Sequence, residues 1–245
     1  MKGWDKSKLK AKHKGAEWIE EAKRNAALEA VKHIKEGFVV GLGSGSTAAY
    51  AIQEIGRLIR QRNWEIQGVP TSYQAFLLAV DNGIPITTLN EHPKLDLTID
   101  GADQVDPDLN LIKGIGGALA REKIVASASE QNIIVTDETK LTKKLGKNQA
   151  VPLEVLPFAL PLVESGIMKM KGKPVLRQGN GKVGPVMTDN GNFILDADFG
   201  IIDAPNKLNS ELKSIPGLVE TDLFIGMTNI VYVGTPTHVH RYERK

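Results

Sequence analysis

The sequence predicts an α/β fold, in which a parallel sheet covered by helices on both faces is accompanied by a smaller inserted α+β domain. Short, fully apolar segments alternate with amphipathic ones over the first part of the chain, which is typical of strands joined by crossover helices. The pattern changes near Asn148, and the apolar segment 229–235 is again typical of a buried strand. We therefore expect a large α/β catalytic domain at 16–147 and 225–245, and a small α+β domain at 148–224.

The composition excludes several classes of protein and site. With 245 residues, of which 41% are hydrophobic and 24% charged, the chain is an ordinary globular protein with room for one large domain or two modest ones. A formal net charge of +2 gives no reason to expect nucleic acid or a membrane surface as a partner. The chain has no cysteine, which excludes disulfides, thiolate chemistry and Cys-ligated metals.

Residues 1–15 are basic and lack the apolar core of a signal peptide, so we expect them to form a flexible tail. No stretch of the chain is apolar enough to span a bilayer. Together with the absence of cysteine, these features favour a cytoplasmic protein.

The expected elements of the large domain follow from the spacing of apolar residues. Apolar side chains recur at helical spacing from Ile19 to Ile34, and Gly37 is a candidate C-cap, which predicts a helix over 16–36. The domain is then expected to continue with a strand at 38–43, a glycine-rich turn opening a helix over 43–59, a strand at 64–69, a helix at 73–80, a strand at 95–99, a helix at 118–127 and a strand at 133–136.

In the small domain, prolines and an Asn-Gly pair mark the boundaries. Asn190-Gly191 indicates a type I′ hairpin between two strands within 186–199. The other expected elements are a strand at 151–156, a helix that ends near 166, a helix at 206–213 and, back in the large sheet, the strand at 229–235.

A glycine-rich loop, 41–47, joins the first strand to its helix. The N–H groups that open a helix lie at the positive end of its dipole and bind phosphate well, and the hydroxyls of Ser44, Ser46 and Thr47 add further donors. The structural alternative is a tight turn with a Ser or Thr N-cap. Because such loops lie at the ligand-binding edge of parallel sheets, we favour a phosphate site.

The same loop also satisfies a dinucleotide fingerprint, through Gly43, Gly45 and Ala48. However, the end of the next strand, at 69–72, offers no acid to hold a ribose diol and no arginine for a 2′-phosphate. A simple phosphate monoester therefore suits the loop better.

The segment 98–126 gathers the side chains that a proton transfer requires. Asp100 is expected at the C-terminal end of a strand, and a turn can bring Asp103 to the same side. Lys113 can offset a developing negative charge, and Glu122, one turn into the helix, can accept and return a proton. The structural alternatives are Asx turns for the aspartates and solvated surface charges for the lysine and the glutamate.

Further residues point to the same edge of the sheet. Gly114, Gly116 and Gly117 leave amides available at the start of the second helix, which predicts another anion site. Lys140 follows another apolar strand and can reach a substrate there, although a surface lysine is an equal interpretation. The 5 histidines of the chain show no ligand spacing, so we expect no metal.

Several motifs occur together in one order: GLGSGSTA, TIDGADQVD, LIKGIGGALAREKIVA, VTDETK, VPLEVLPFA and TDNGNFILD. In these the chain resembles the ribose-5-phosphate isomerase family of the A type, over about residues 20–235. The resemblance implies a Rossmann-like α/β domain with a small α+β domain. It also implies interconversion of D-ribose 5-phosphate and D-ribulose 5-phosphate, in the non-oxidative pentose phosphate pathway and without a cofactor. The chain departs from the family at Ser44, where threonine is common, and at Ile115, which interrupts a run that is often all glycine.

Residue by residue, the resemblance implies Glu122 as the general base of an enediolate mechanism. Asp100, Asp103 and Lys113 would line the site and assist ring opening and proton movement. The residues that would hold the substrate are Ser44, Gly45, Ser46, Thr47, Gly101, Ala102, Gly114, Ile115, Gly116, Lys140 and, on the first helix, Lys23.

Two rival functions can be weighed on the sequence. A sugar-phosphate-binding regulator would need the phosphate loop but not Glu122, and it would normally carry a helix-turn-helix, for which the residues before the first core helix are too few. An NAD-linked dehydrogenase would need the ribose-diol acid that is absent. We expect a sugar phosphate as the partner, neither nucleic acid nor membrane, and a homo-oligomer, either a dimer or a tetramer.

Overall fold

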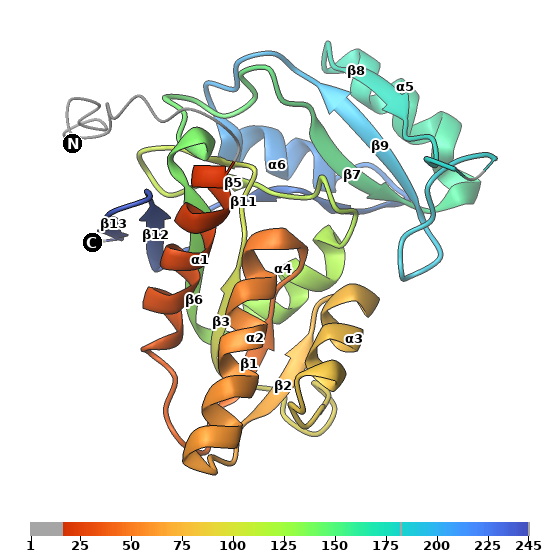
Figure 1. Cartoon of the computed structure of the whole chain (residues 1–245). Coiled ribbons are helices and arrows are strands. Elements are labelled where there is room, and N and C mark those ends of the chain that lie inside the picture. The colour runs from red at the N-terminus through yellow and green to blue at the C-terminus, as the bar shows by residue number, and fades with distance from the viewer. Residues whose placement is uncertain (1–16, 182, 245) are drawn as a thin grey trace.

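The computed structural model describes residues 17–181 and 183–244, so the tail predicted at 1–15 lies outside the described residues. The large sheet has six strands in the order β13-β12-β6-β3-β1-β2 (Figure 1). The strands are β1 (Val39–Leu42), β2 (Gln67–Pro70), β3 (Leu95–Asp100), β6 (Ser129–Asp137), β12 (Ile230–Gly234) and β13 (Val239–Glu243). Neighbouring strands run parallel, except that β13 is antiparallel to β12. The predicted parallel sheet is confirmed, and so is the return of the strand predicted at 229–235, which is β12.

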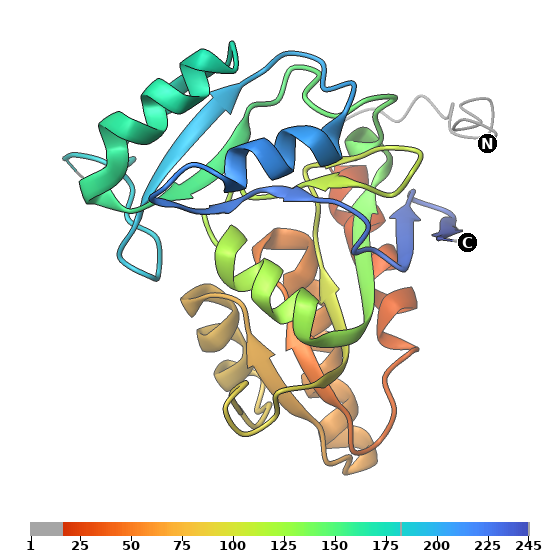
Figure 2. The ribbon, with the colours of Figure 1, turned by 180° about the vertical axis from the view of Figure 1, so that it is seen from behind.

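Helices cover both faces of this sheet, as predicted. On the face seen in Figure 1 lie α1 (Glu17–Val31), α2 (Gly45–Arg62) and α3 (Tyr73–Asp81), and on the face seen in Figure 2 lies α4 (Leu119–Ala128). Alternate residues of β1 point to opposite faces. Leu42 therefore belongs to the core beneath α1 and α2, whereas Val39 packs with Val125 of α4.

The first helix is shorter than the predicted 16–36, because α1 ends at Val31. Tight turns follow it, in which the N–H of Ile34 donates to the carbonyl of Val31 at 3.0 Å. Ile34 is nevertheless buried in the core, so the apolar spacing continues beyond the end of the helix. Gly37, with φ of +82°, turns the chain into β1 rather than capping the helix.

Two antiparallel sheets lie together at the end of the large sheet where its parallel strands finish (Figures 1 and 2). The larger has the order β10-β7-β9-β8, with β7 (Val151–Val155), β8 (Lys173–Leu176), β9 (Phe193–Asp198) and β10 (Leu218–Thr221). The smaller has the order β11-β5-β4, with β4 (Gln104–Val105), β5 (Leu111–Ile112) and β11 (Leu223–Phe224). The remaining helices are η1 (Glu138–Lys140), η2 (Pro157–Ala159), α5 (Leu160–Lys169) and α6 (Pro205–Lys213).

The type I′ hairpin predicted at Asn190-Gly191 is wrong. A type I′ turn needs positive φ at both central residues, but only Gly191 has it, with φ of +80°. The N–H of Gly191 donates to the carbonyl of Thr188 at 2.9 Å, so the loop is one residue longer than a two-residue turn. Of the two strands predicted here, β9 forms, whereas 186–189 makes only an isolated bridge at Met187.

A buried carboxylate explains this wider turn. Glu154 of β7 has no exposed surface, and its Oε1 accepts hydrogen bonds from Thr188 Oγ1 at 3.0 Å, Asn190 Nδ2 at 2.9 Å and Asn192 Nδ2 at 2.7 Å. Three side chains of the turn and its flanks therefore share one buried acceptor, which favours this wider turn. The Asn-Gly pair in the sequence does not predict these hydrogen bonds, because Glu154 lies on another strand.

Several strands were not predicted. β8 contains Pro174 and exposes Val175, and β13 is a mostly polar edge strand, so neither has the expected apolar pattern. β10 is a short strand whose central residues are only half-buried. The strands β4, β5 and β11 have two residues each, which is too short to show a period. Among the described residues, no helix combines the length and the apolarity needed to cross a bilayer.

Close packing at the C-terminal ends of the strands brings the predicted site segments together. The N–H of Gly43, after β1, donates to the carbonyl of Ile99 in β3 at 3.0 Å. A Cβ atom on Gly43 would lie 2.3 Å from Oδ1 and 2.5 Å from Cα of Asp100. Only glycine therefore allows the loop after β1 to lie against the end of β3.

We predict that Gly43→Ala lowers the free energy of unfolding by about 1–3 kcal/mol, because the added methyl group overlaps backbone that moves only with β3. Urea unfolding followed by circular dichroism measures this loss. Gly116→Ala is the matched control, since an added Cβ there meets nothing within 4 Å. Equal stability of the two variants would contradict the close approach.

Candidate active site

The four-stranded antiparallel sheet β10-β7-β9-β8 is called the second sheet below. A cavity of about 500 Å³ lies where the loops after β1, β3 and β6 face this sheet. Its lining includes Lys23, Ser44, Gly45, Ser46, Thr47, Gly101, Ala102, Asp103, Lys113, Gly114, Gly116, Glu122 and Lys140. The structure thus brings together nearly all the residues predicted from the sequence. Of the predicted set, Asp100 and Ile115 do not line the cavity.

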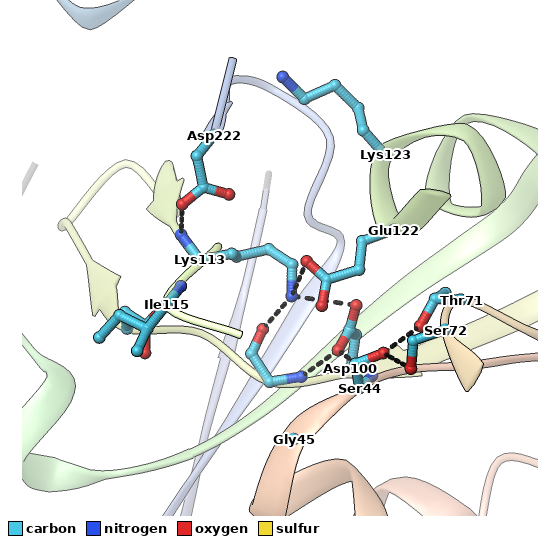
Figure 3. Close-up of polar contacts among 12 residues, drawn as sticks. Ser44, Gly45, Thr71, Ser72, Asp100, Lys113, Ile115, Glu122, Lys123 and Asp222 are labelled. Carbon is cyan, nitrogen blue, oxygen red and sulfur yellow. Dashed lines mark hydrogen bonds and ion pairs between the residues drawn. The ribbon is translucent and has the colours of Figure 1, made fainter. Parts of the chain in front are cut away.

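The buried ammonium group of Lys113, which belongs to the cavity lining, lies among the polar groups shown in Figure 3. Lys113 Nζ lies 3.0 Å from Asp100 Oδ2 and 3.5 Å from Glu122 Oε2, and it donates to the carbonyl of Gly101 at 2.5 Å. The three side chains come from β3, from the end of β5 and from the first turn of α4. Each residue is at most 5% exposed, so solvent screens these charges weakly.

The sequence suggested that the side chain of Asp100 projects into the cavity. In the structure it does not line the cavity and lies behind Lys113 instead. Its Oδ1 accepts the N–H of Ser44 at 3.1 Å and of Gly101 at 2.7 Å, while its Oδ2 faces the ammonium. Asp100 therefore joins the loop after β1 to the loop after β3 and fixes the position of Lys113.

Glu122 is buried and faces the cavity, so it is not the solvated helix residue that the structural alternative proposed. Its Oε2 has no hydrogen-bond partner in the described part of the chain. Burial raises the pKa of Glu122 well above its ordinary value, and the charge of Asp100 raises it further, while Lys113 opposes both effects. A carboxyl group in this position holds a proton more readily than an exposed glutamate does, which suits a group that must both accept and return one.

Asp103 lies on the cavity wall between two groups from other loops. Its Oδ2 accepts the N–H of Ile115 at 3.1 Å, and its Oδ1 lies 3.9 Å from Lys140 Nζ. Burial raises the pKa of the Asp103 carboxyl, while the hydrogen bond from Ile115 and the charge of Lys140 lower it. Ile115 thus contributes its backbone, whereas its side chain is exposed.

At the start of α2, the loop after β1 offers donors to the cavity. The N–H groups of Ser46 and Thr47 lie in the first helical turn and have no intrahelical acceptor. Ser44 makes no side-chain cap, because its Oγ lies 2.8 Å from Thr71 Oγ1 and 2.6 Å from Ser72 Oγ instead. Lys23 of α1 reaches this turn and donates to Ser46 Oγ at 3.2 Å. A hydroxyl-rich helix start with a lysine beside it is suited to a phosphate group.

Sequence reasoning missed Asp222, which lies between β10 and β11. This residue is fully buried, and its Oδ2 accepts the N–H of Lys113 at 2.6 Å. Its Oδ1 has no partner among the described residues. Burial raises the pKa of Asp222 to about 8, although Lys113 and Lys123 oppose the shift. No local motif marks this aspartate, because its partner stands 109 residues away in the sequence.

Gln74 was missed as well, since glutamine at the start of a helix carries no signal. Its Oε1 accepts the N–H of Gly45 at 2.8 Å, and its side chain lines the cavity. On the opposite wall, Met187, Thr188 and Asp189 of the turn before β9 complete the lining. Within 17–181 and 183–244, no cluster of three or more acidic or histidine side chains is arranged to hold a metal ion.

Comparison with known proteins identifies the family. Residues 67–238 match the family model described as "Ribose 5-phosphate isomerase A (phosphoriboisomerase A)". The chain is 50% identical over 213 residues to ribose-5-phosphate isomerase A of Methanothermobacter thermautotrophicus, covering 87% of this chain and 93% of that protein. The chain belongs to the ribose 5-phosphate isomerase A family.

Solved structures of this family share the fold. The enzyme of Methanocaldococcus jannaschii is 43% identical, with a TM-score of 0.88 over 91% of this chain and 99% of its own. A D-ribose-5-phosphate isomerase in complex with phospho-erythronic acid is 46% identical, with a TM-score of 0.90 over 92% of this chain and 99% of its own. The family resemblance read from the sequence motifs is confirmed, and the relatives are named as isomerases.

The raised pKa of Asp222 predicts a pH dependence of stability. The folded state holds this proton more tightly than the unfolded chain, so the stabilisation is complete below the ordinary pKa of 3.8 and is lost as the pH rises to about 8. We expect Asp222→Asn to flatten the fall in unfolding free energy over this range, measured by urea unfolding at several pH values. Asp81→Asn, at the exposed end of α3, should follow the unmodified protein. A slope unchanged by Asp222→Asn would contradict the assignment.

Proposed function

We propose that the chain interconverts D-ribose 5-phosphate and D-ribulose 5-phosphate through an enediolate, with Glu122 as the base. One observation carries the proposal: Glu122 is buried on the cavity wall, 3.5 Å from the ammonium of Lys113. A carboxylate of raised pKa beside a fixed positive charge suits a proton transfer next to a developing oxyanion. Membership of the family, and the substrate in the names of its relatives, support the same reaction.

Glu122 would move the proton in both halves of the reaction. Transfer of the carbonyl group from C1 to C2 requires one proton to leave C2 and one to arrive at C1. Glu122 takes the first proton as a carboxylate and returns it as a carboxylic acid. Its raised pKa makes the protonated form of Glu122 more accessible than that of an ordinary glutamate, which favours a group that must act in both directions.

Lys113 would stabilise the enediolate as a fixed charge. Burial alone would lower the pKa of Lys113, but the charges of Asp100 and Glu122 raise it above its ordinary value, so the group stays an ammonium throughout. The N–H groups of Gly114 and Gly116 have no acceptor in the described part of the chain, and both residues line the cavity. These donors supply the preorganised oxyanion site, so the reaction needs neither a metal nor a nicotinamide cofactor.

The phosphate would bind at the start of α2, to Ser46 and Thr47, with the ammonium of Lys23 beside them. Furanose opening would use Asp103 rather than Asp100. Asp103 lines the cavity and has a raised pKa, whereas Asp100 lies behind Lys113 with both oxygens engaged. Lys140, 3.9 Å from Asp103, would hold a substrate hydroxyl or the phosphate from the same side.

The two rival functions have less support. Burying a glutamate beside an ammonium group costs free energy of desolvation, and a sugar-phosphate sensor would gain no function from that arrangement. A dehydrogenase would need an acid after β2, where Thr71 and Ser72 instead bond to Ser44. We further propose that the enzyme acts in the cytoplasm and forms a homo-oligomer, a dimer or a tetramer. The exposed apolar side chains of Phe158 and Leu162 support self-association, which light scattering tests.

We predict that Glu122→Gln lowers kcat by about 10²–10⁴-fold, because the amide cannot accept a proton. The variant should still bind phospho-erythronic acid, measured by calorimetry, since the other contacts are kept. Activity is followed as ribulose 5-phosphate formation in EDTA without nicotinamide. Glu130→Gln, an exposed position at the start of β6, is the control. Full turnover by a folded Glu122→Gln protein would remove Glu122 from the mechanism.

For the phosphate site, the double variant Ser46→Ala, Thr47→Ala should raise KM by roughly tenfold or more and leave kcat nearly unchanged. The reason is that hydrogen bonds to a charged phosphate stabilise ground and transition states alike, by about 1.5–3 kcal/mol. Steady-state kinetics separates the two constants. Ser127→Ala on α4, whose hydroxyl bonds to the carbonyl of Lys123, serves as the control. A KM equal to that of the control would place the phosphate elsewhere.

A further inference from the structure

An arginine of the second sheet reaches the loop that precedes α4. Arg177 directly follows β8, and its Nη1 donates to the carbonyl of Gly114 at 3.1 Å and to the carbonyl of Ile115 at 2.8 Å. These two carbonyls belong to the loop from which Gly114 and Gly116 line the cavity. None of the sequence motifs marks Arg177, and it does not line the cavity itself.

The geometry of the peptide bond gives this contact a consequence inside the cavity. In a planar trans peptide, the carbonyl oxygen and the following N–H point in opposite directions. Because Arg177 holds the carbonyl of Ile115, the N–H of Gly116 points away from Arg177, and Gly116 is a cavity-lining residue. The preceding peptide is fixed from both sides, since Arg177 holds the carbonyl of Gly114 while Asp103 accepts the N–H of Ile115 at 3.1 Å.

The guanidinium group is itself held rigidly. Asp196 of β9 accepts Arg177 Nε at 2.8 Å and Nη2 at 2.5 Å, which is the paired arrangement that fixes the plane of an arginine. The backbone of Arg177 is anchored as well, because its N–H donates to the carbonyl of Ile194 at 2.9 Å. A rigid path of contacts therefore runs from the second sheet to the two peptide groups on either side of Ile115, and through the second of them to the N–H of Gly116.

We propose that Arg177, oriented by Asp196, is a positioning residue for the oxyanion site: it sets the direction of the Gly116 N–H, one of the donors that stabilise the enediolate. This inference rests on the proposed function and extends it to the second sheet. Arg177 touches no substrate, so its effect appears where the loop amides matter most, in the transition state. A purely structural contact would instead lower stability without separating kcat from KM.

The first experiment is Arg177→Met, which keeps an unbranched apolar stem and removes the guanidinium donors. We expect kcat to fall about 10–100-fold with KM changed less than about threefold, since misaligned oxyanion donors are lost mainly from the transition state. Arg60→Met is the matched control, because Arg60 Nη1 also donates to a loop carbonyl, that of Asn82, away from the cavity. Its kinetic constants should stay within about twofold of those of the unmodified enzyme.

Two ligands separate positioning from general damage. Phospho-erythronic acid carries a carboxylate that resembles the enediolate in charge, whereas inorganic phosphate probes only the helix start at α2. In Arg177→Met, the affinity for phospho-erythronic acid should fall about tenfold or more, in parallel with kcat/KM, while the affinity for phosphate stays unchanged. If both affinities fall equally, or kcat is retained, the proposal is overturned.

Two further variants keep the test decisive if Arg177→Met folds poorly. Arg177→Lys retains a positive charge but cannot hold the two-point pair with Asp196 and the two loop carbonyls together, and it should show the same loss of kcat with normal thermal unfolding. Asp196→Asn should show a smaller loss that is not additive with that of Arg177→Met, because both act through one contact. Additive losses would contradict the proposal. Failure of the unmodified enzyme to isomerise ribose 5-phosphate would overturn the proposed function itself.

Discussion

The whole site depends on keeping one ammonium group charged in a place that water does not reach. Removing such a group from water costs several kcal/mol, and only close carboxylates repay that cost. Lys113 meets this requirement through Asp100 and Glu122, while Asp222 holds its backbone. These partners come from β3, from α4 and from the connection between β10 and β11. The contacts of Lys113 therefore join the large sheet, one of its helices and the two antiparallel sheets.

The sequence was most informative where structure and chemistry are local. Apolar segments predicted the parallel sheet. Glycines before α2 and α4 led us to expect anion sites, and the residue types of Asp103, Lys113 and Glu122 led us to expect a proton-transfer site, and the structure places these residues on one cavity. The residues that escaped prediction act over long distances in the chain: Asp222 through the backbone of Lys113, and Arg177 through two loop carbonyls. The Asn-Gly turn was misjudged for a related reason, since a buried glutamate on another strand decides its shape.

The second sheet contributes to the site on two sides. Its turn before β9 forms one wall, and Asp189 in this turn accepts the N–H of Tyr73 at 2.7 Å, at the first residue of α3. Arg121, next to Glu122 on α4, donates to the carbonyl of Asp189 at 2.8 Å. The wall is therefore joined to helices on both faces of the large sheet, and the cavity is defined by contacts between the sheets rather than by either sheet alone.

The place of β12 in the large sheet has a consequence for biosynthesis. This strand pairs with β6, yet all of residues 138–229 lie between them in the chain. While the ribosome adds those residues, the side of β6 that faces away from β3 is an open strand edge, of the kind that recruits other chains. A nascent or truncated chain that stops before residue 230 would therefore contain every strand except β12 and β13, and one edge of β6 would stay open. Such fragments should depend on chaperones for their solubility, whereas in the folded protein β12 pairs with this side of β6 and the mostly polar strand β13 forms the edge instead.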